Sequence, residues 1–121
     1  MALRPDLNGL RVQEPGHPEI YLIDEGRKRH IPDPPTFDAL FRNWDGINQD
    51  LHIDEIDTGF PISSGAVLAL GKADPSVYLV DRGVKRHVTS PPVMDKYNFR
   101  WPATRIDQII LDCIPNGNDI N

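Results

Sequence analysis

Residues 18–35 read PEIYLIDEGRKRHIPDPP, and residues 75–92 read PSVYLVDRGVKRHVTSPP. A shift of 57 residues superimposes the two stretches without a gap, and Pro, Tyr, Leu, Asp, Gly, Lys, Arg and His all coincide. The same shift places Trp44 on Trp101, and with one inserted residue IDTG at 56–59 falls on IPNG at 114–117. Self-similarity at a fixed period is typical of a repeated structural unit. The sequence therefore predicts two tandem repeats, at about 5–61 and 62–121.

Each copy of this stretch predicts a β-hairpin. The runs IYLID and VYLVD are β-branched and aromatic, which favours strands, and each is followed by a second run that ends KRHI or KRHV. Gly26 and Gly83 lie between the runs and are expected to supply the positive φ of the turn. The preceding runs GLRVQ and GAVLAL are expected to pair as a third strand.

Short helices are expected after each hairpin. Asp33 and Ser90 precede proline pairs and are predicted N-caps, because proline at the first helical position loses no hydrogen bond. The helices would span PTFDALF and PVMDKYN. We predict an α+β fold of two repeats, each a hairpin or three-stranded sheet followed by short helices, packed with pseudo-two-fold symmetry.

A further helix is predicted in TRIDQIILDCI, residues 104–114. Its apolar residues recur at the spacing of one helical face, and Thr104 would be its cap. The residues on that face are Ile106, Ile109, Ile110, Cys113 and Ile114. Cys113 is the single cysteine, so it forms no internal disulfide, and it is expected to be buried.

Size and charge narrow the class of protein. At 121 residues the chain is expected to form a single domain, 1–121, that contains both repeats. Its net charge of −5 argues against a nucleic-acid partner, since such binding needs clustered Lys and Arg. There is no apolar run that predicts membrane insertion and no stretch typical of a signal peptide.

The whole pattern resembles a known repeat module. The resemblance lies in a hairpin of the type VYLI..G.KRHI, then P.P..FD, a Trp about seven residues beyond the Phe, and a closing I..G. It covers residues 18–59 and 75–117. Such modules occur mainly in bacterial extracellular and cell-envelope-associated proteins. The resemblance implies a non-catalytic module, appended to secreted enzymes or present in arrays, outside the cell or at its envelope.

Two catalytic interpretations are weak. His30 and His87 each stand alone on a strand, whereas a zinc site needs three or four convergent ligands, so we expect no metal and interpret them as cross-strand partners. Asp57 begins DTG, the active-site tripeptide of aspartic proteases, in which two carboxylates share a proton. The repeat places this tripeptide at a turn, so we predict no enzyme and no cofactor and keep the protease as a distant alternative.

A binding function is the preferred hypothesis. Tyr and Arg on the two hairpins, if they share a face, would present aromatic planes beside hydrogen-bond donors, an arrangement that suits sugars. The two Trp residues are included, although Trp at matching repeat positions is more often a core anchor. The predicted ligand-binding residues are Tyr21, Arg29, His30, Trp44, Tyr78, Arg86, His87 and Trp101.

These residues predict two equivalent sites for a cell-wall or cell-surface glycan, weak singly and stronger together. The alternative is a protein-interaction or scaffold module that uses the same faces for a protein ligand. Surface strands would also allow two chains to extend one sheet, so a homodimer is compatible with the pattern.

Overall fold

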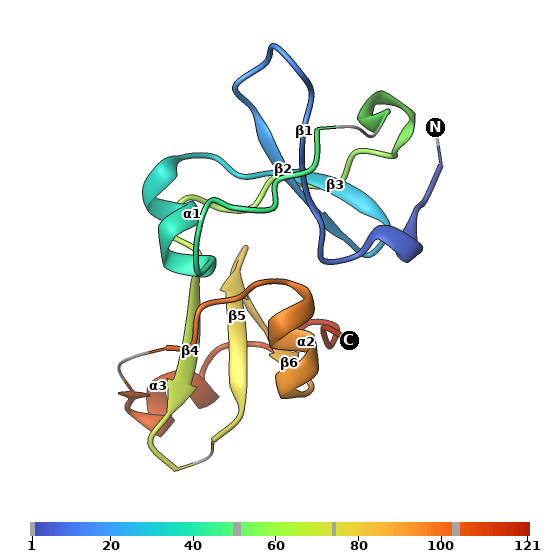
Figure 1. The fold of residues 1–121 in the computed structure, drawn as a ribbon. Helices are drawn as coiled ribbons and strands as arrows, with labels where there is room; N and C mark the ends of the chain where they lie inside the picture. Colours follow the sequence, from blue (N-terminus) through green and yellow to red (C-terminus); the bar gives the residue numbers. More distant parts are fainter. Residues whose placement is uncertain (1, 50–51, 74, 103–104) are drawn as a thin grey trace.

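The computed structural model describes residues 2–49, 52–73, 75–102 and 105–121. It contains a three-stranded sheet in the order β1-β2-β3 and a four-stranded sheet in the order β6-β5-β4-β7, with short helices around them (Figure 1). The predicted α+β class is confirmed. The elements are η1 (Pro5–Leu7), β1 (Arg11–Gln13), β2 (Ile20–Asp24), β3 (Arg27–His30), α1 (Pro34–Leu40), η2 (Ile53–Glu55), β4 (Val67–Gly71), β5 (Val77–Asp81), β6 (Val84–Val88), α2 (Pro91–Lys96), β7 (Arg105–Ile106) and α3 (Gln108–Asp112).

Both predicted hairpins are present, as β2–β3 and β5–β6. Each has a two-residue turn, Glu25-Gly26 or Arg82-Gly83, and all four residues have positive φ, between 53° and 78°. Positive φ at both central residues is the geometry whose twist matches that of the flanking strands, so the predicted role of the two glycines is confirmed. The predicted third strands also form, since β1 pairs with β2 and β4 pairs with β5.

The helices after the hairpins begin at the predicted caps. The Asp33 carboxylate accepts a hydrogen bond from the Thr36 backbone N–H at 2.8 Å, in the first turn of α1. Ser90 holds the N-cap position of α2, but its side chain makes no capping hydrogen bond. The proline pairs open both helices, as the sequence indicated.

The prediction of a helix over residues 104–114 is wrong in its length and in which residues it buries. Arg105 and Ile106 instead pair as β7 with β4, and α3 covers only Gln108–Asp112. Leu111 is the buried residue of α3, while Ile109 is 74% exposed and Cys113 is exposed as well. Because Arg105 and Ile106 belong to β7, α3 begins later, and its Leu111 lies beside Gly71 of β4. Thr104 lies outside the described residues.

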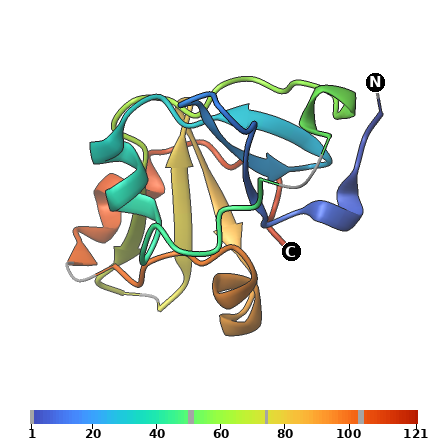
Figure 2. The same ribbon diagram turned by 45° about the horizontal axis from the view of Figure 1, so that its top comes forward.

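One hydrophobic core draws on both sheets and on the helices α1 and α2. The strands of one sheet run across those of the other, and the core lies between them (Figure 2). A smaller cluster lies on the other face of the first sheet, against η2. The main core contains Leu22, Ile31, Phe37, Leu40, Phe41, Ile62, Ala66, Leu68, Val77, Leu79, Val88, Met94, Tyr97, Phe99 and Ile120.

Irregular backbone from the same chain runs along three of the four outer strands, β1, β3 and β6. Val12 in β1 bridges to Asn48, Lys28 in β3 to Thr58, and Lys85 in β6 to Asn116. These segments occupy edges through which two chains would extend a sheet. These three strands therefore have no free edge at the bridged positions for a second chain to pair with. The homodimer stays a prediction. Among the helices of the described residues, none is long and apolar enough to cross a membrane.

Candidate functional site

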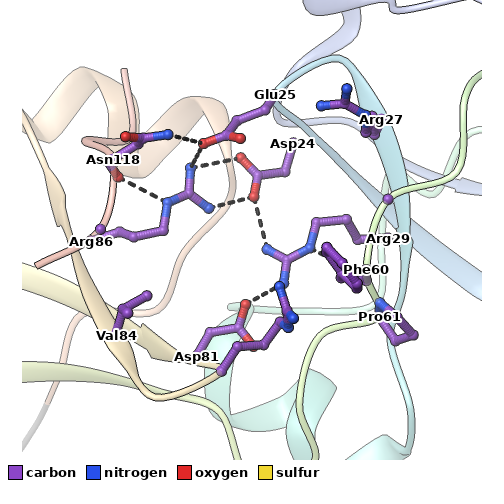
Figure 3. A pocket seen from close by; sticks show the side chains of 13 residues that line it. Asp24, Glu25, Arg27, Arg29, Phe60, Pro61, Asp81, Val84, Arg86 and Asn118 are labelled. Carbon is purple, nitrogen blue, oxygen red and sulfur yellow. Dashed lines mark hydrogen bonds and ion pairs between the residues drawn. The ribbon is translucent and has the colours of Figure 1, made fainter. Parts of the chain in front are cut away.

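Four buried charged residues join the two hairpins. Asp24 and Asp81 end β2 and β5, and Arg29 and Arg86 lie on the neighbouring strands β3 and β6. The Asp24 carboxylate, only 3% exposed, accepts from Arg29 Nη1 at 2.9 Å and from Arg86 Nη2 at 3.0 Å. Arg29 also donates through Nη2 to Asp81 (Figure 3). Each arginine therefore pairs with a carboxylate of the other hairpin.

The segments that follow each hairpin complete this cluster. Arg29 Nε donates to the Phe60 carbonyl at 2.8 Å, and Arg86 Nε donates to the Asn118 carbonyl at 2.9 Å. Ser63 donates to Asp81 Oδ1 from its backbone N–H at 2.8 Å and from Oγ at 2.9 Å. Every buried side-chain nitrogen and oxygen in the described part of the chain has a hydrogen-bond partner.

The ion pairs shift the pKa values of their members. Burial alone would raise the pKa of the Asp24 carboxyl, but the Arg86 and Arg29 guanidiniums outweigh that effect and hold it below its usual range. Burial would lower the pKa of Arg86, and Asp24 and Glu25 together raise it. Tyr97 packs nearby, and its burial, with the charge of Asp24, raises the pKa of its hydroxyl to about 12. Near neutral pH, Asp24 and Arg86 therefore stay charged and the Tyr97 hydroxyl stays neutral.

A pocket of about 710 Å³ opens above the cluster, between the two hairpin turns. Phe60, which is 66% exposed, lies at its wall, and the Arg82 guanidinium stacks over the Phe60 ring at 3.8 Å from the ring centre. Pro61, Val84 and Asn118 contribute further surface. The charged residues of the lining are Asp24, Glu25, Arg27, Arg29, Asp81, Arg82 and Arg86. The pocket thus combines one exposed aromatic ring with many planar hydrogen-bonding groups.

The tripeptide DTG (57–59) runs alongside β3 and bonds to it through backbone groups. The Lys28 N–H donates to the Asp57 carbonyl at 2.9 Å, and the Gly59 N–H donates back to the Lys28 carbonyl at 2.9 Å. Lys85 makes the same pair of bonds with Pro115 and Gly117, each at 2.8 Å. Glycine permits this close approach, since a Cβ on Gly117 would lie 2.9 Å from Arg86 Cγ. Asp57 is not among the residues that line the pocket.

The predicted faces that combine tyrosine with arginine do not form. Tyr21 lies opposite His30 and Leu22 lies opposite Arg29, so tyrosine and arginine point to opposite faces of the sheet. The second hairpin has the same register, with Tyr78 opposite His87. The two-residue turns decide this outcome, because a shift of one residue moves a side chain to the other face. The prediction of a shared face is therefore wrong. Of these four residues, Arg29 and Arg86 line the pocket, and Tyr21 and Tyr78 do not.

The histidines are cross-strand partners, as interpreted from the sequence. The ring centres of Tyr21 and His30 are 5.6 Å apart, and those of Tyr78 and His87 are 5.4 Å apart. A lysine, rather than an arginine, lies over each tyrosine ring, with Lys28 at 5.7 Å from the ring centre. Within the ranges that the structure describes, no group of three or more His, Cys, Asp or Glu could hold a metal ion.

The tryptophans are not core anchors. Trp44 is 45% exposed and stacks on Phe37, with ring centres 3.9 Å apart, while its Nε1 donates to Asp38 at 2.8 Å. Trp101 is 50% exposed. Neither Trp44 nor Trp101 lines the pocket. A ligand role for Tyr21, Tyr78, the two histidines and the two tryptophans stays a prediction.

Sequence reasoning missed most of the pocket. Asp24 and Asp81 coincide under the 57-residue shift, and that agreement was the available signal for them. Phe60 has no aromatic counterpart in the second repeat, and Arg82 corresponds to a glutamate in the first. The repeat therefore gave no signal for either residue. Comparison with protein-family models, with curated proteins and with solved structures finds no match for the chain.

Proposed function

We propose that this protein is a non-catalytic carbohydrate-binding module whose site is the pocket between the two hairpin turns. The observation that carries the proposal is the exposed Phe60 ring beside guanidinium, carboxylate and amide groups in one pocket of about 710 Å³. That volume falls within the range of roughly 300–1,000 Å³ typical of small-molecule sites.

The chemistry of the lining favours a saccharide. Sugar hydroxyls both donate and accept, so they suit a surface where guanidiniums and the Asn118 amide donate while Glu25 accepts. The apolar face of a sugar ring packs against an aromatic side chain, and Phe60 offers one. The single pocket replaces the two equivalent faces expected from the sequence, because Tyr21 and Tyr78 point away from the arginines.

We also propose that the two halves are copies of one unit packed about an approximate two-fold axis. The support lies in the shared hairpin register and in the ion pairs that cross between the halves. The closing segments add to it, since the bonds of Lys28 to 57–59 correspond to those of Lys85 to 115–117. The one-residue offset between these segments is the insertion seen in the sequence alignment.

A protein-interaction module is the second candidate. The observation in its favour is the pair Ile109 and Ile110 on α3, two large apolar side chains that are both exposed. Large exposed apolar surface often marks a protein-binding site. The aspartic-protease alternative remains more distant, because Asp57 holds a backbone position along β3.

A glycan array followed by calorimetric titration of the strongest hit tests the first proposal. Phe60→Ala is expected to weaken binding at least about tenfold, because the ring loses its contact with the sugar. Trp101→Ala is the matched control, since it removes an aromatic ring of similar exposure outside the pocket. Circular dichroism verifies that both variants fold.

Two outcomes would contradict the proposal. One is the absence of any saccharide that binds, together with capture of a protein ligand that Ile110→Ser abolishes, which would favour the second candidate. The other is equal weakening by Phe60→Ala and Trp101→Ala, which would place the site outside the pocket. Hydrolysis of a peptide that Asp57→Asn abolishes would restore the enzymatic alternative.

A further inference from the structure

The two ends of the pocket have the same backbone but different side chains. Phe60 and Asn118 occupy equivalent places, because the carbonyl of each accepts from the Nε of the nearest buried arginine. Glu25 and Arg82 are likewise the first residues of equivalent turns. The turn residue of one hairpin meets the closing segment of the other half in both cases. Arg82 stacks on Phe60, and Glu25 accepts a hydrogen bond from Asn118 at 3.3 Å.

One further pair distinguishes the ends. Arg27 begins β3 and Val84 begins β6, so they hold matching positions in the two hairpins. Both lie beside the glycine that precedes the wall residue, with Arg27 Cβ 3.1 Å from a Cβ built on Gly59. One end of the pocket therefore has Arg27, Phe60 and Arg82. The other end has Val84, Asn118 and Glu25.

The charges at the two ends are satisfied to different degrees. The floor of the pocket is neutralised, because Arg29 and Arg86 each pair with buried carboxylates. Glu25 at one end accepts from Arg86 Nη2 at 3.1 Å. Among the described residues, no carboxylate pairs with Arg27 or Arg82. Unpaired positive charge thus collects at one end, in a protein whose net charge is −5.

The Arg82 guanidinium lies over the Phe60 ring, and no hydrogen bond from its side chain to another described residue is present. A guanidinium that lies flat on a ring uses its face for that contact, while its N–H donors point outward in the plane. Held in this way, it is oriented for two parallel hydrogen bonds to a planar carboxylate. Phe60 keeps 66% of its surface exposed despite this contact, so part of the ring is open to a ligand.

We propose that the ligand of this pocket is an acidic saccharide, which binds in one orientation with a carboxylate at the end that holds Arg82 and Arg27 and its other end toward Asn118. This inference rests on the proposed carbohydrate function and specifies its ligand class. A carboxylate also occurs in acidic peptides. The saccharide is favoured because the rest of the lining includes both donors and acceptors, and a sugar hydroxyl can bond to either.

The test compares two probes that differ only in charge. Trigalacturonate and the trisaccharide obtained by reduction of its carboxyl groups are titrated into the protein by calorimetry at low and high salt. The acidic probe is expected to bind about 10- to 100-fold more tightly, the effect of one or two charge-assisted hydrogen bonds. High salt should reduce this preference, because the guanidiniums lie at the surface.

The variants assign the preference to the two arginines. Arg82→Gln and Arg27→Gln are each expected to reduce binding of trigalacturonate toward that of the neutral probe, while binding of the neutral probe is unchanged. Arg82→Lys keeps the charge but loses the planar fork, so it should recover only part of the affinity. Arg100→Gln is the matched control, because Arg100 is exposed and lies outside the pocket.

The outcomes separate this inference from the proposed function. Equal binding of the charged and neutral probes, both weakened by Phe60→Ala, would overturn the acidic ligand and leave the carbohydrate site intact. Binding of poly-glutamate that depends on Arg82, with neither trisaccharide bound, would overturn the saccharide itself. A loss of preference in Arg100→Gln equal to that in Arg82→Gln would show that general charge, rather than this pocket, carries it.

Discussion

The β2–β3 and β5–β6 hairpins have the same register and the same turn geometry, yet they stabilise their terminal aspartates differently. Asp24 accepts from two buried arginines, Arg29 and Arg86. Asp81 accepts from one arginine and from Ser63, which supplies both a backbone N–H and a hydroxyl. Equivalent backbone positions therefore do not imply equal energetic roles. Asp24 accepts two hydrogen bonds from the arginine of the other hairpin, and Asp81 accepts one.

The rims of the two hairpins differ more than their interiors. Leu22 and Leu79 fill equivalent places in the core, and both are fully buried. At the pocket, by contrast, an arginine at 27 corresponds to a valine at 84. Close packing in the interior allows few substitutions, whereas residues at the rim of the pocket contact solvent and can vary. Leu22 and Leu79 thus support the fold in the same way, whereas positions 27 and 84 give the two ends of the pocket different side chains.

Asp24→Asn is expected to have the largest effect. The substitution preserves shape but leaves two buried guanidiniums without the negative charge they share, and breaking a buried ion pair costs about 3–5 kcal/mol. Asp81→Asn should cost less, because Arg29 keeps Asp24 and the asparagine can still accept from Ser63. Urea unfolding followed by circular dichroism measures both free energies. An equal or greater loss for Asp81→Asn would remove the asymmetry proposed between the two positions.

Acid should weaken the fold through the same carboxylate. The pKa of Asp24 is lowered in the folded state, so its contribution is present above the unfolded pKa of about 3.9 and is lost as pH falls through the folded value. Each unit of that lowering corresponds to about 1.4 kcal/mol. Thermal unfolding between pH 7 and pH 2 should show a steeper fall below pH 4 in the wild type than in Asp24→Asn. Parallel curves would assign the acid sensitivity to other carboxylates.

The tryptophans give the smallest expected difference. Trp44→Ala removes the stack on Phe37 and the hydrogen bond to Asp38, and should reduce the free energy of unfolding by about 1 kcal/mol. Trp101→Ala should change it by less than about 0.5 kcal/mol, as is usual for surface substitutions. Asp95, the counterpart of Asp38, accepts instead from Arg42. Equal losses in urea unfolding would show that Trp101 packs as Trp44 does.

The local elements of the fold were predictable from the sequence. Gly26 and Gly83 identified the turns, and Asp33 and Ser90 identified the helix starts, because turns and caps depend on residues close in sequence. The helix at 104–114 failed for the opposite reason. Ile106 joins β7 against β4, a strand more than thirty residues earlier in the chain, and this tertiary pairing overrides the helical pattern.

The candidate site was less predictable because it depends on whether each hairpin turn contains two residues or one more. With two residues in the turn, Arg29 faces Leu22 and reaches the cluster; with a bulge it would face Tyr21. The sequence left both geometries open. The pocket also requires two segments far apart in sequence, since Phe60 and Arg82 meet only when the halves pack together. Neither residue belongs to the motif that the two halves share.

The pocket lies where the two hairpins meet, and one polypeptide encodes both of its ends. In a symmetric homodimer, a site on the two-fold axis has identical ends, and every substitution appears at both of them. Here Arg27 and Val84 are separate codons, so a change at one end leaves the other unaltered. The covalent link between the halves thus lets the two ends of the pocket differ, which the proposed binding of an asymmetric ligand in one orientation requires.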